Sequence, residues 1–154
     1  MNWDAIGAVG EIVGALAVIL SLGYVGVQIK QNTNASRSSS YRSAKSQFNA
    51  INTSVAQSAE LTVIMNKALR SYNDLDEKEK SRAGWVWLSY TNIWETLYHE
   101  SRDLTGHDEL WKAEERTLLV VARLGGYWEW WQQNQIGGTE EFRNHIEQLM
   151  QETK

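Results

Sequence analysis

The chain has 154 residues, with no proline, no cysteine and eight tryptophans, and its formal net charge at pH 7 is -4. Once a membrane segment is set aside, this length leaves room for one modest domain, and the absence of cysteine excludes disulfide bonds and thiol catalysis. The acidic balance argues against a nucleic-acid partner, because phosphate contacts are made by clustered Lys and Arg.

Residues 5–29 form the first predicted element, an apolar run whose only charged residue is Glu11. A helix of about 20 residues crosses the hydrocarbon core of a bilayer, so the run is long enough to span it. Trp3 and Tyr24 lie near its two ends and Lys30 follows it, as is typical of membrane interfaces. We therefore predict a helix surrounded by a lipid bilayer. The alternative is a buried helix of a soluble bundle.

The flanking charges predict the orientation of this helix. Four basic residues follow it before any acidic residue occurs: Lys30, Arg37, Arg42 and Lys45. Asp4 stands alone on the other side. By the positive-inside tendency, the N-terminus lies outside and the rest of the chain is cytoplasmic. Because the first residues lack the basic region of a secretory signal, we expect an uncleaved single-pass anchor over residues 1–30.

Small residues recur at steps of three and four along the anchor: Gly7, Gly10, Gly14, Ala17 and Ser21. This spacing places them on one helix face, which we call the small face. Helices in lipid associate by close packing at small residues, so the small face predicts a homo-oligomer. The alternative is that small residues are simply frequent in membrane helices.

Glu11 lies at the border of the small face. Carboxyl groups inside a membrane are costly and usually face a partner or a water-filled cavity. We expect this one to hydrogen-bond a neighbouring helix and fix its register. The alternative is a ring of glutamates that lines a cation pathway in an oligomer.

The juxtamembrane segment, residues 31–57, has two interpretations. Its Ser- and Asn-rich part, residues 32–40, is typical of a flexible linker. Apolar residues nevertheless recur at helical spacing further along: Tyr41, Ala44, Phe48, Ile51 and Val55. No Pro or Gly interrupts residues 28–59, which favours a helix that continues from the anchor. The sequence leaves both interpretations open.

Residues 58–154 predict a small cytoplasmic helical domain. Ser58 has the character of a helix N-cap, and Asp76 with Glu79 forms a capping box at the start of the longest helix. Later helix boundaries are predicted at Thr105-Gly106, at Gly125-Gly126, and at Gly137-Gly138 followed by Thr139. Because no stretch alternates with a period of two, strands are not expected and the fold class is all-α.

The tryptophans of this domain fall into two groups. Four lie on or beside apolar helix faces and are expected in the core: Trp85, Trp87, Trp94 and Trp111. Three others occur close together: Trp128, Trp130 and Trp131. Three indoles so close in sequence cannot all face one core, so at least one should contact a partner subunit or neighbouring protein, a membrane surface or a small ligand.

Glu95, His99 and Asp103 share a helix face and are the best metal-site candidate. A di-iron bundle needs Glu-xx-His pairs on two helices, and a zinc site needs a further strong ligand, for which only His107 and His145 remain. We therefore expect a solvated charged face with no metal and no cofactor. No nucleophile with a neighbouring base and no phosphate loop is found, so the sequence favours a protein that is not an enzyme.

Several short motifs together resemble a family of small, uncharacterised bacterial proteins. They are Trp3 to Glu11, Tyr24-Val25, Gln28 to Thr33, Leu110-Trp111, Trp130-Trp131 and Glu141 to Arg143. The resemblance runs over nearly the whole chain. It implies one N-terminal transmembrane helix, a cytoplasmic helical domain and a bacterial inner-membrane location, and it carries no established activity. The chain has Gly125-Gly126 and Gly138-Thr139 where the family often has proline.

These observations predict a non-catalytic, membrane-anchored helical protein. It self-associates, scaffolds a membrane-protein partner at the cytoplasmic face, or does both. The alternative function is a channel-like oligomer in which Glu11 lines a pathway.

Overall fold

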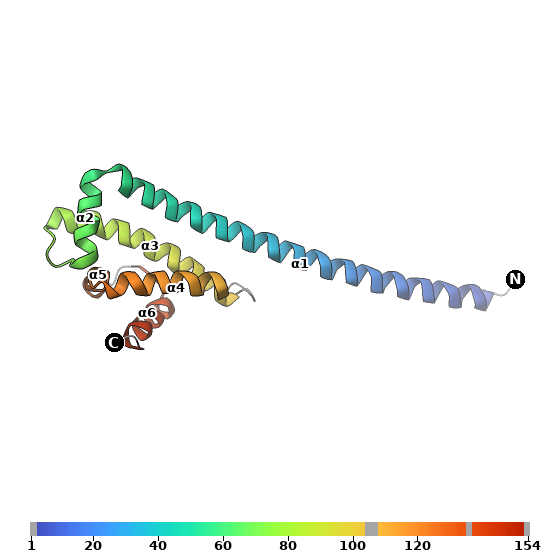
Figure 1. The fold of residues 1–154 in the computed structure, drawn as a ribbon. Coiled ribbons are helices and arrows are strands. Elements are labelled where there is room, and N and C mark those ends of the chain that lie inside the picture. Colours follow the sequence, from blue (N-terminus) through green and yellow to red (C-terminus); the bar gives the residue numbers. More distant parts are fainter. Residues whose placement is uncertain (1–2, 104–107, 135–136, 153–154) are drawn as a thin grey trace. The chain divides into compact units, whose positions relative to one another are not determined.

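The computed structural model describes residues 3–103, 108–134 and 137–152, and every regular element within these ranges is an α-helix (Figure 1). The helices are α1 (Trp3–Gln57), α2 (Ala59–Arg70), α3 (Glu77–Asp103), α4 (Asp108–Arg123), α5 (Gly126–Asn134) and α6 (Glu140–Glu152). The predicted all-α fold class is confirmed.

The chain divides into two compact units, residues 1–40 and residues 41–154. Residues 32–40 are helical, so the helix interpretation of the juxtamembrane segment holds and the linker interpretation does not. The end of α1 belongs to the second unit, because Ala44 and Phe48 are buried in its core. We call residues 41–154 the helical unit.

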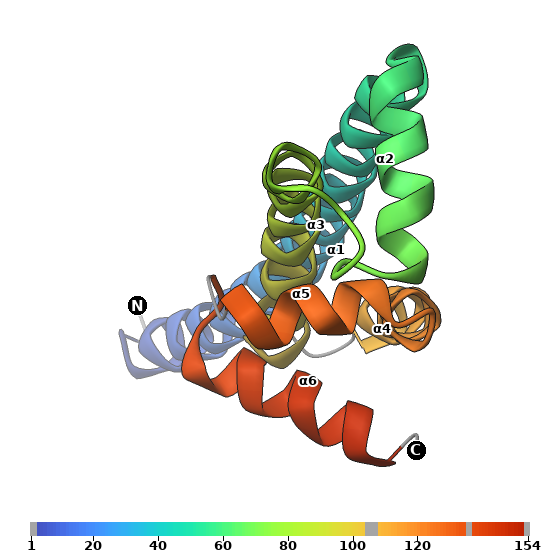
Figure 2. The same ribbon diagram turned by 90° about the vertical axis from the view of Figure 1, so that its left-hand side faces the viewer.

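Within the helical unit, α4 contacts α3, α5 and α6, and α2 contacts α3 and α5 (Figure 2). Of the apolar positions that recur at helical spacing at the end of α1, Ala44 and Phe48 are buried, Ile51 and Val55 are partly buried, and Tyr41 is 43% exposed. The largest fully buried side chains are Trp87, Thr91, Leu118, Tyr127, Phe142 and Ile146. Aromatic rings dominate this core, which suits a small domain because each ring buries a large apolar area.

Side chains cap the starts of three helices as predicted. The Ser58 hydroxyl accepts a hydrogen bond from the Leu61 N–H at 3.1 Å. Asp76 Oδ1 accepts from the Glu79 N–H at 2.8 Å, and the Asp76 N–H donates to Glu79 Oε2 at 3.1 Å. Thr139 Oγ1 caps α6 in the same way. Each bond satisfies an N–H group that the first helical turn leaves without a partner.

Glycines serve two different purposes at the helix ends. Gly125, Gly137 and Gly138 have φ angles of 97°, 92° and 82°, a region that other residues rarely adopt. Gly126 is needed for space, because a Cβ there would lie 1.7 Å from the carbonyl oxygen of Ala68 on α2. The expected boundary at Thr105-Gly106 lies outside the described residues.

Candidate functional site

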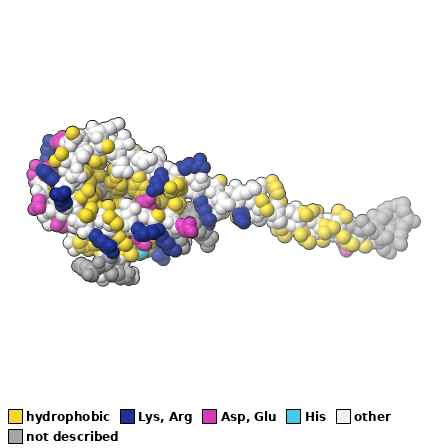
Figure 3. All heavy atoms as spheres, in the orientation of Figure 1, with side chains coloured by type: hydrophobic (Ala, Val, Ile, Leu, Met, Phe, Trp, Pro, Cys, Tyr) yellow, Lys and Arg dark blue, Asp and Glu magenta, His cyan; other side chains and the backbone are white. Residues whose placement is uncertain are grey.

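The apolar stretch of α1 is widely exposed. Among the described residues, one helix is long and apolar enough to cross a membrane, and none of its most apolar 18-residue window is buried. Its large side chains are widely exposed, for example Ile19 at 64% and Leu20 at 73%. Figure 3 shows hydrophobic side chains gathered along this part of α1. By its length, composition and exposure, this stretch is a candidate membrane span.

The small face is equally open. A Cβ placed on Gly7, Gly10 or Gly14 would meet no heavy atom within 4 Å. Ala17 and Ser21 are exposed as well. A second helix could therefore approach the backbone of α1 closely along this face.

The Glu11 side chain is exposed beside the small face. Within the described part of the chain it makes no hydrogen bond and no ion pair. Any partner of this carboxyl group must therefore come from the surroundings of α1.

The tryptophan predictions need two corrections. Trp130 and Trp131 are each 3% exposed and belong to the core, so their indole rings are not available for contact with a partner. With Tyr127 they follow the helical spacing i, i+3, i+4, which places all three rings on one buried face. Trp128 is partly buried and packs against the core, and its contact with a partner stays a prediction. Trp85, expected in the core, is 69% exposed instead.

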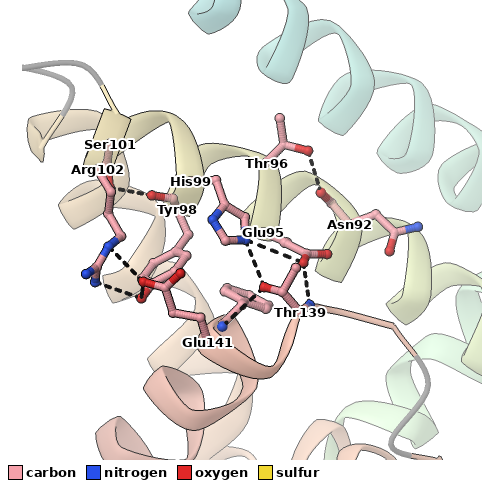
Figure 4. Close-up of polar contacts among 10 residues, drawn as sticks. Asn92, Glu95, Thr96, Tyr98, His99, Ser101, Arg102, Thr139 and Glu141 are labelled. Carbon is pink, nitrogen blue, oxygen red and sulfur yellow. Dashed lines mark hydrogen bonds and ion pairs between the residues drawn. The ribbon is translucent and has the colours of Figure 1, made fainter.

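Glu95 and His99 contact Thr139 at the start of α6 (Figure 4). Glu95 Oε1 accepts the Thr139 N–H at 2.6 Å, and His99 Nε2 lies 2.8 Å from Thr139 Oγ1. The expectation of a solvated charged face is wrong for Glu95, whose side chain is only 19% exposed. No group of three or more metal-ligating side chains occurs among the described residues. The Asp103 side chain and His107 lie outside them.

Further polar contacts fasten α6 to its neighbours. Arg102 bonds both the Tyr98 hydroxyl and Glu141 at 3.0 Å (Figure 4). His145 Nε2 lies 2.8 Å from Glu115 Oε1 on α4. These ionisable groups therefore have structural partners, and their arrangement does not form a nucleophile with its base.

A cleft of about 500 Å³, open to solvent, lies in the helical unit between the end of α1, α2, α3 and α4. Its apolar floor includes Phe48, Met65, Trp87, Tyr90 and Trp94. The Phe48 and Tyr90 rings are stacked with centroids 5.7 Å apart, and the Tyr90 and Trp94 centroids are 5.6 Å apart. The volume is in the range of small-molecule sites.

Neutral polar side chains surround this floor: Asn49, Asn52, Thr62, Asn66 and Thr117. The Tyr90 hydroxyl donates to Asn52 Oδ1, while Thr62 and Thr117 donate to backbone carbonyls. The side-chain amides of Asn49 and Asn66 have no hydrogen-bond partner in the described part of the chain. They are the side chains of the cleft whose polar groups are all free to bind a ligand.

The charges in the cleft cancel. Lys45 Nζ lies 2.6 Å from Glu114 Oε1, and the hydrogen bond to Glu114 raises the pKa of Lys45. Burial raises the pKa of the Tyr90 hydroxyl, so this group is neutral at physiological pH. Trp94 Nε1 is buried without a hydrogen-bond partner among the described residues. This nitrogen is closed off from solvent, so a ligand in the cleft would not reach it.

The cleft is not apparent from the sequence. Phe48, Asn49 and Asn52 lie on adjacent positions of one helix face, and this mixture of an aromatic ring with two amides was the only local signal. The other walls come from α2, α3 and α4, whose positions depend on the tertiary fold.

No protein-family model, no curated protein and no solved structure matches this chain.

Proposed function

We propose that the chain is a non-catalytic, membrane-anchored protein that self-associates through the small face of α1. It holds its helical unit at the cytoplasmic face of a bacterial inner membrane, where it binds a neighbouring membrane protein or further copies of itself. The observation that carries this proposal is the long apolar stretch of α1, none of whose most apolar 18-residue window is buried.

The energy of burial supports the anchor. Each large aliphatic side chain of this stretch gains roughly 1.5 to 3 kcal/mol when it leaves water. Ile12, Leu16, Ile19 and Leu22 are all more than half exposed, so the chain itself provides less than half of this gain. A bilayer provides it along the whole stretch. Lys30 and Arg37, which follow the stretch, support a cytoplasmic location for the helical unit.

The open glycines support self-association. Without side chains at Gly10 and Gly14, two copies of α1 can bring their backbones into contact, which larger side chains would prevent. Gly23 is equally open but lies on nearly the opposite side of the helix. Gly23 is therefore a control position for substitutions on the small face.

Fractionation tests the anchor and its orientation. We expect the full-length chain to remain in the membrane pellet after carbonate extraction and to enter solution only with detergent. In spheroplasts, protease added from outside should leave the helical unit intact. A chain that stays in the supernatant without detergent would contradict the anchor, and digestion of the helical unit would contradict the orientation.

A matched pair of variants tests self-association. Gly14→Leu should abolish cross-linking between copies in native membranes, because its side chain blocks the close backbone approach. Gly23→Leu makes the same chemical change off the small face and should cross-link like the unchanged chain. Equal cross-linking of both variants would contradict association through the small face.

A further inference from the structure

We propose that the cleft of the helical unit binds a small, neutral, flat ring molecule that carries an amide edge, meaning a carbonyl next to a ring N–H. This inference concerns the helical unit alone and does not depend on the membrane proposal. It rests on the aromatic floor, the cancelled charges and the two unpartnered amides of the cleft.

The floor favours a flat ring. Phe48 and Tyr90 are stacked with an interplanar angle of 27°, and Tyr90 and Trp94 are inclined by 32°. All three rings line the cleft, and Tyr90, the most exposed of them, offers the surface against which a planar molecule can stack. A volume of about 500 Å³ accommodates a bicyclic or tricyclic molecule but not a folded protein segment.

The charges favour a neutral ligand. Lys45 and Glu114 neutralise each other across 2.6 Å at the edge of the cleft. An anionic ligand would meet the Glu114 carboxylate, and a cationic ligand would meet the Lys45 ammonium group. Either one would have to compete with an ion pair that already satisfies both residues.

The amides favour a complementary edge. Asn49 on α1 and Asn66 on α2 line the cleft, and each offers one donor group and one acceptor group. Neither has a hydrogen-bond partner among the described residues, so both are available to a ligand. A carbonyl next to an N–H presents the matching acceptor and donor, and each hydrogen bond formed contributes about 1 kcal/mol.

The probe for this proposal is 2-quinolone, a flat, neutral, bicyclic lactam. Two related molecules isolate its features: quinoline lacks the amide edge, and quinoline-2-carboxylate is an anion of similar shape. Binding is measured by equilibrium dialysis on the full-length chain in detergent micelles. Partition into the micelles is measured with micelles that contain no protein and is subtracted.

Two matched variants test the location. Asn49→Trp places a large side chain at an exposed position that lines the cleft, and should abolish saturable binding of 2-quinolone. Gln47→Trp makes the same addition on the opposite side of α1 and should leave binding unchanged. Both positions are exposed, so both variants should fold, and their far-ultraviolet circular dichroism should match the unchanged chain.

A third variant tests the amide edge. Asn49→Leu keeps the side-chain size but removes the hydrogen-bonding groups. It should weaken 2-quinolone binding about tenfold, which corresponds to about 1.4 kcal/mol, and should leave any binding of quinoline unchanged. Unchanged binding of 2-quinolone in this variant would contradict a hydrogen bond between Asn49 and the amide edge.

Several outcomes would overturn the proposal. They are no saturable binding of 2-quinolone, equal binding in Asn49→Trp and the unchanged chain, or tighter binding of quinoline-2-carboxylate. Saturable binding of N-acetyl-phenylalaninamide without binding of 2-quinolone would also overturn it and assign the cleft to a peptide.

Discussion

The hydroxyl groups of Thr91 and Tyr127 lie 2.9 Å apart in the interior of the helical unit, where both residues are 0% exposed. Thr91 donates its only hydroxyl proton to the Trp87 carbonyl at 2.8 Å. Tyr127 must therefore donate to the Thr91 oxygen. This bond joins α3 to α5 at the centre of the aromatic core.

Thr91→Val should destabilise the helical unit more than Tyr127→Phe does. The valine leaves the buried Tyr127 hydroxyl without an acceptor, which costs about 1 to 3 kcal/mol. The phenylalanine removes the donor, and Thr91 keeps its bond to Trp87. Urea unfolding of the full-length chain in micelles, followed by tryptophan fluorescence, measures both effects. The reverse order would show that Tyr127 has another acceptor.

Alkaline pH should destabilise the protein through Tyr127. Burial raises the pKa of this hydroxyl above its ordinary value of 10.0, because the phenolate is poorly solvated in the core. Below pH 10 the group is protonated in both states. Above pH 10 the unfolded state loses the proton first, so the free energy of unfolding falls as the pH rises.

Tyr127→Phe lacks this ionisation and provides the comparison. The stability difference between the unchanged chain and this variant should shrink between pH 7 and pH 11, as measured by urea unfolding. Lys45 and Lys67, whose pKa values are also raised, act equally in both proteins. A difference that does not change with pH would show that Tyr127 is accessible to solvent.

Asp76→Ala should destabilise the start of α3 by about 1 kcal/mol, because the Glu79 N–H loses its capping acceptor. Asp76→Asn keeps a side-chain oxygen at the same position and should retain most of the stability. Thermal unfolding in micelles measures both variants. Equal losses would mean that the charge of Asp76, and not its hydrogen bond, stabilises the helix.

The ion pair between Lys67 and Glu79 should stabilise the folded state only at intermediate pH, where both groups are charged. The hydrogen bond from Lys67 lowers the pKa of Glu79 below 4.5, and Glu79 raises the pKa of Lys67 above 10.5. The stabilisation is present above pH 4.5 and disappears as the pH falls through the lowered pKa of Glu79. Lys67→Gln should therefore lower the melting temperature slightly at pH 7, and this effect should shrink as the pH is lowered below 4.5.

Gly126→Ala should be among the most destabilising small substitutions in the chain. The added Cβ would overlap the Ala68 carbonyl oxygen, so α5 would have to move away from α2. Overpacking of this kind costs about 1 to 3 kcal/mol or more. Gly23→Ala, which meets no atom within 4 Å, is the control and should not destabilise the helical unit. Equal melting temperatures would show that α2 and α5 are further apart.

Glu11→Gln keeps the hydrogen-bonding ability of the side chain and removes its charge. If Glu11 fixes the register of neighbouring helices, this variant should cross-link like the unchanged chain, and Glu11→Leu should cross-link less. Ion flux into liposomes should be the same for the unchanged chain and Glu11→Gln. A flux that this substitution reduces would favour the channel-like oligomer.

Local features of the helices were predictable because they depend on residues close together in the sequence. The Ser58 cap, the capping box of Asp76 and Glu79, and the cap at Thr139 each involve hydrogen bonds across three residues. Helical spacing likewise predicted the buried positions Phe48 and Trp87. The apolar run of α1 needed only its length and composition.

Only the tertiary structure decided which helix faces are covered. Spacing groups residues onto a face, but the cover of that face comes from helices distant in the sequence. The tertiary structure leaves Trp85 exposed and buries Trp130 and Trp131. It also brings Glu95 within hydrogen-bond distance of the Thr139 N–H. The cleft has the same origin, because its walls belong to four helices whose relative positions follow from packing in the core.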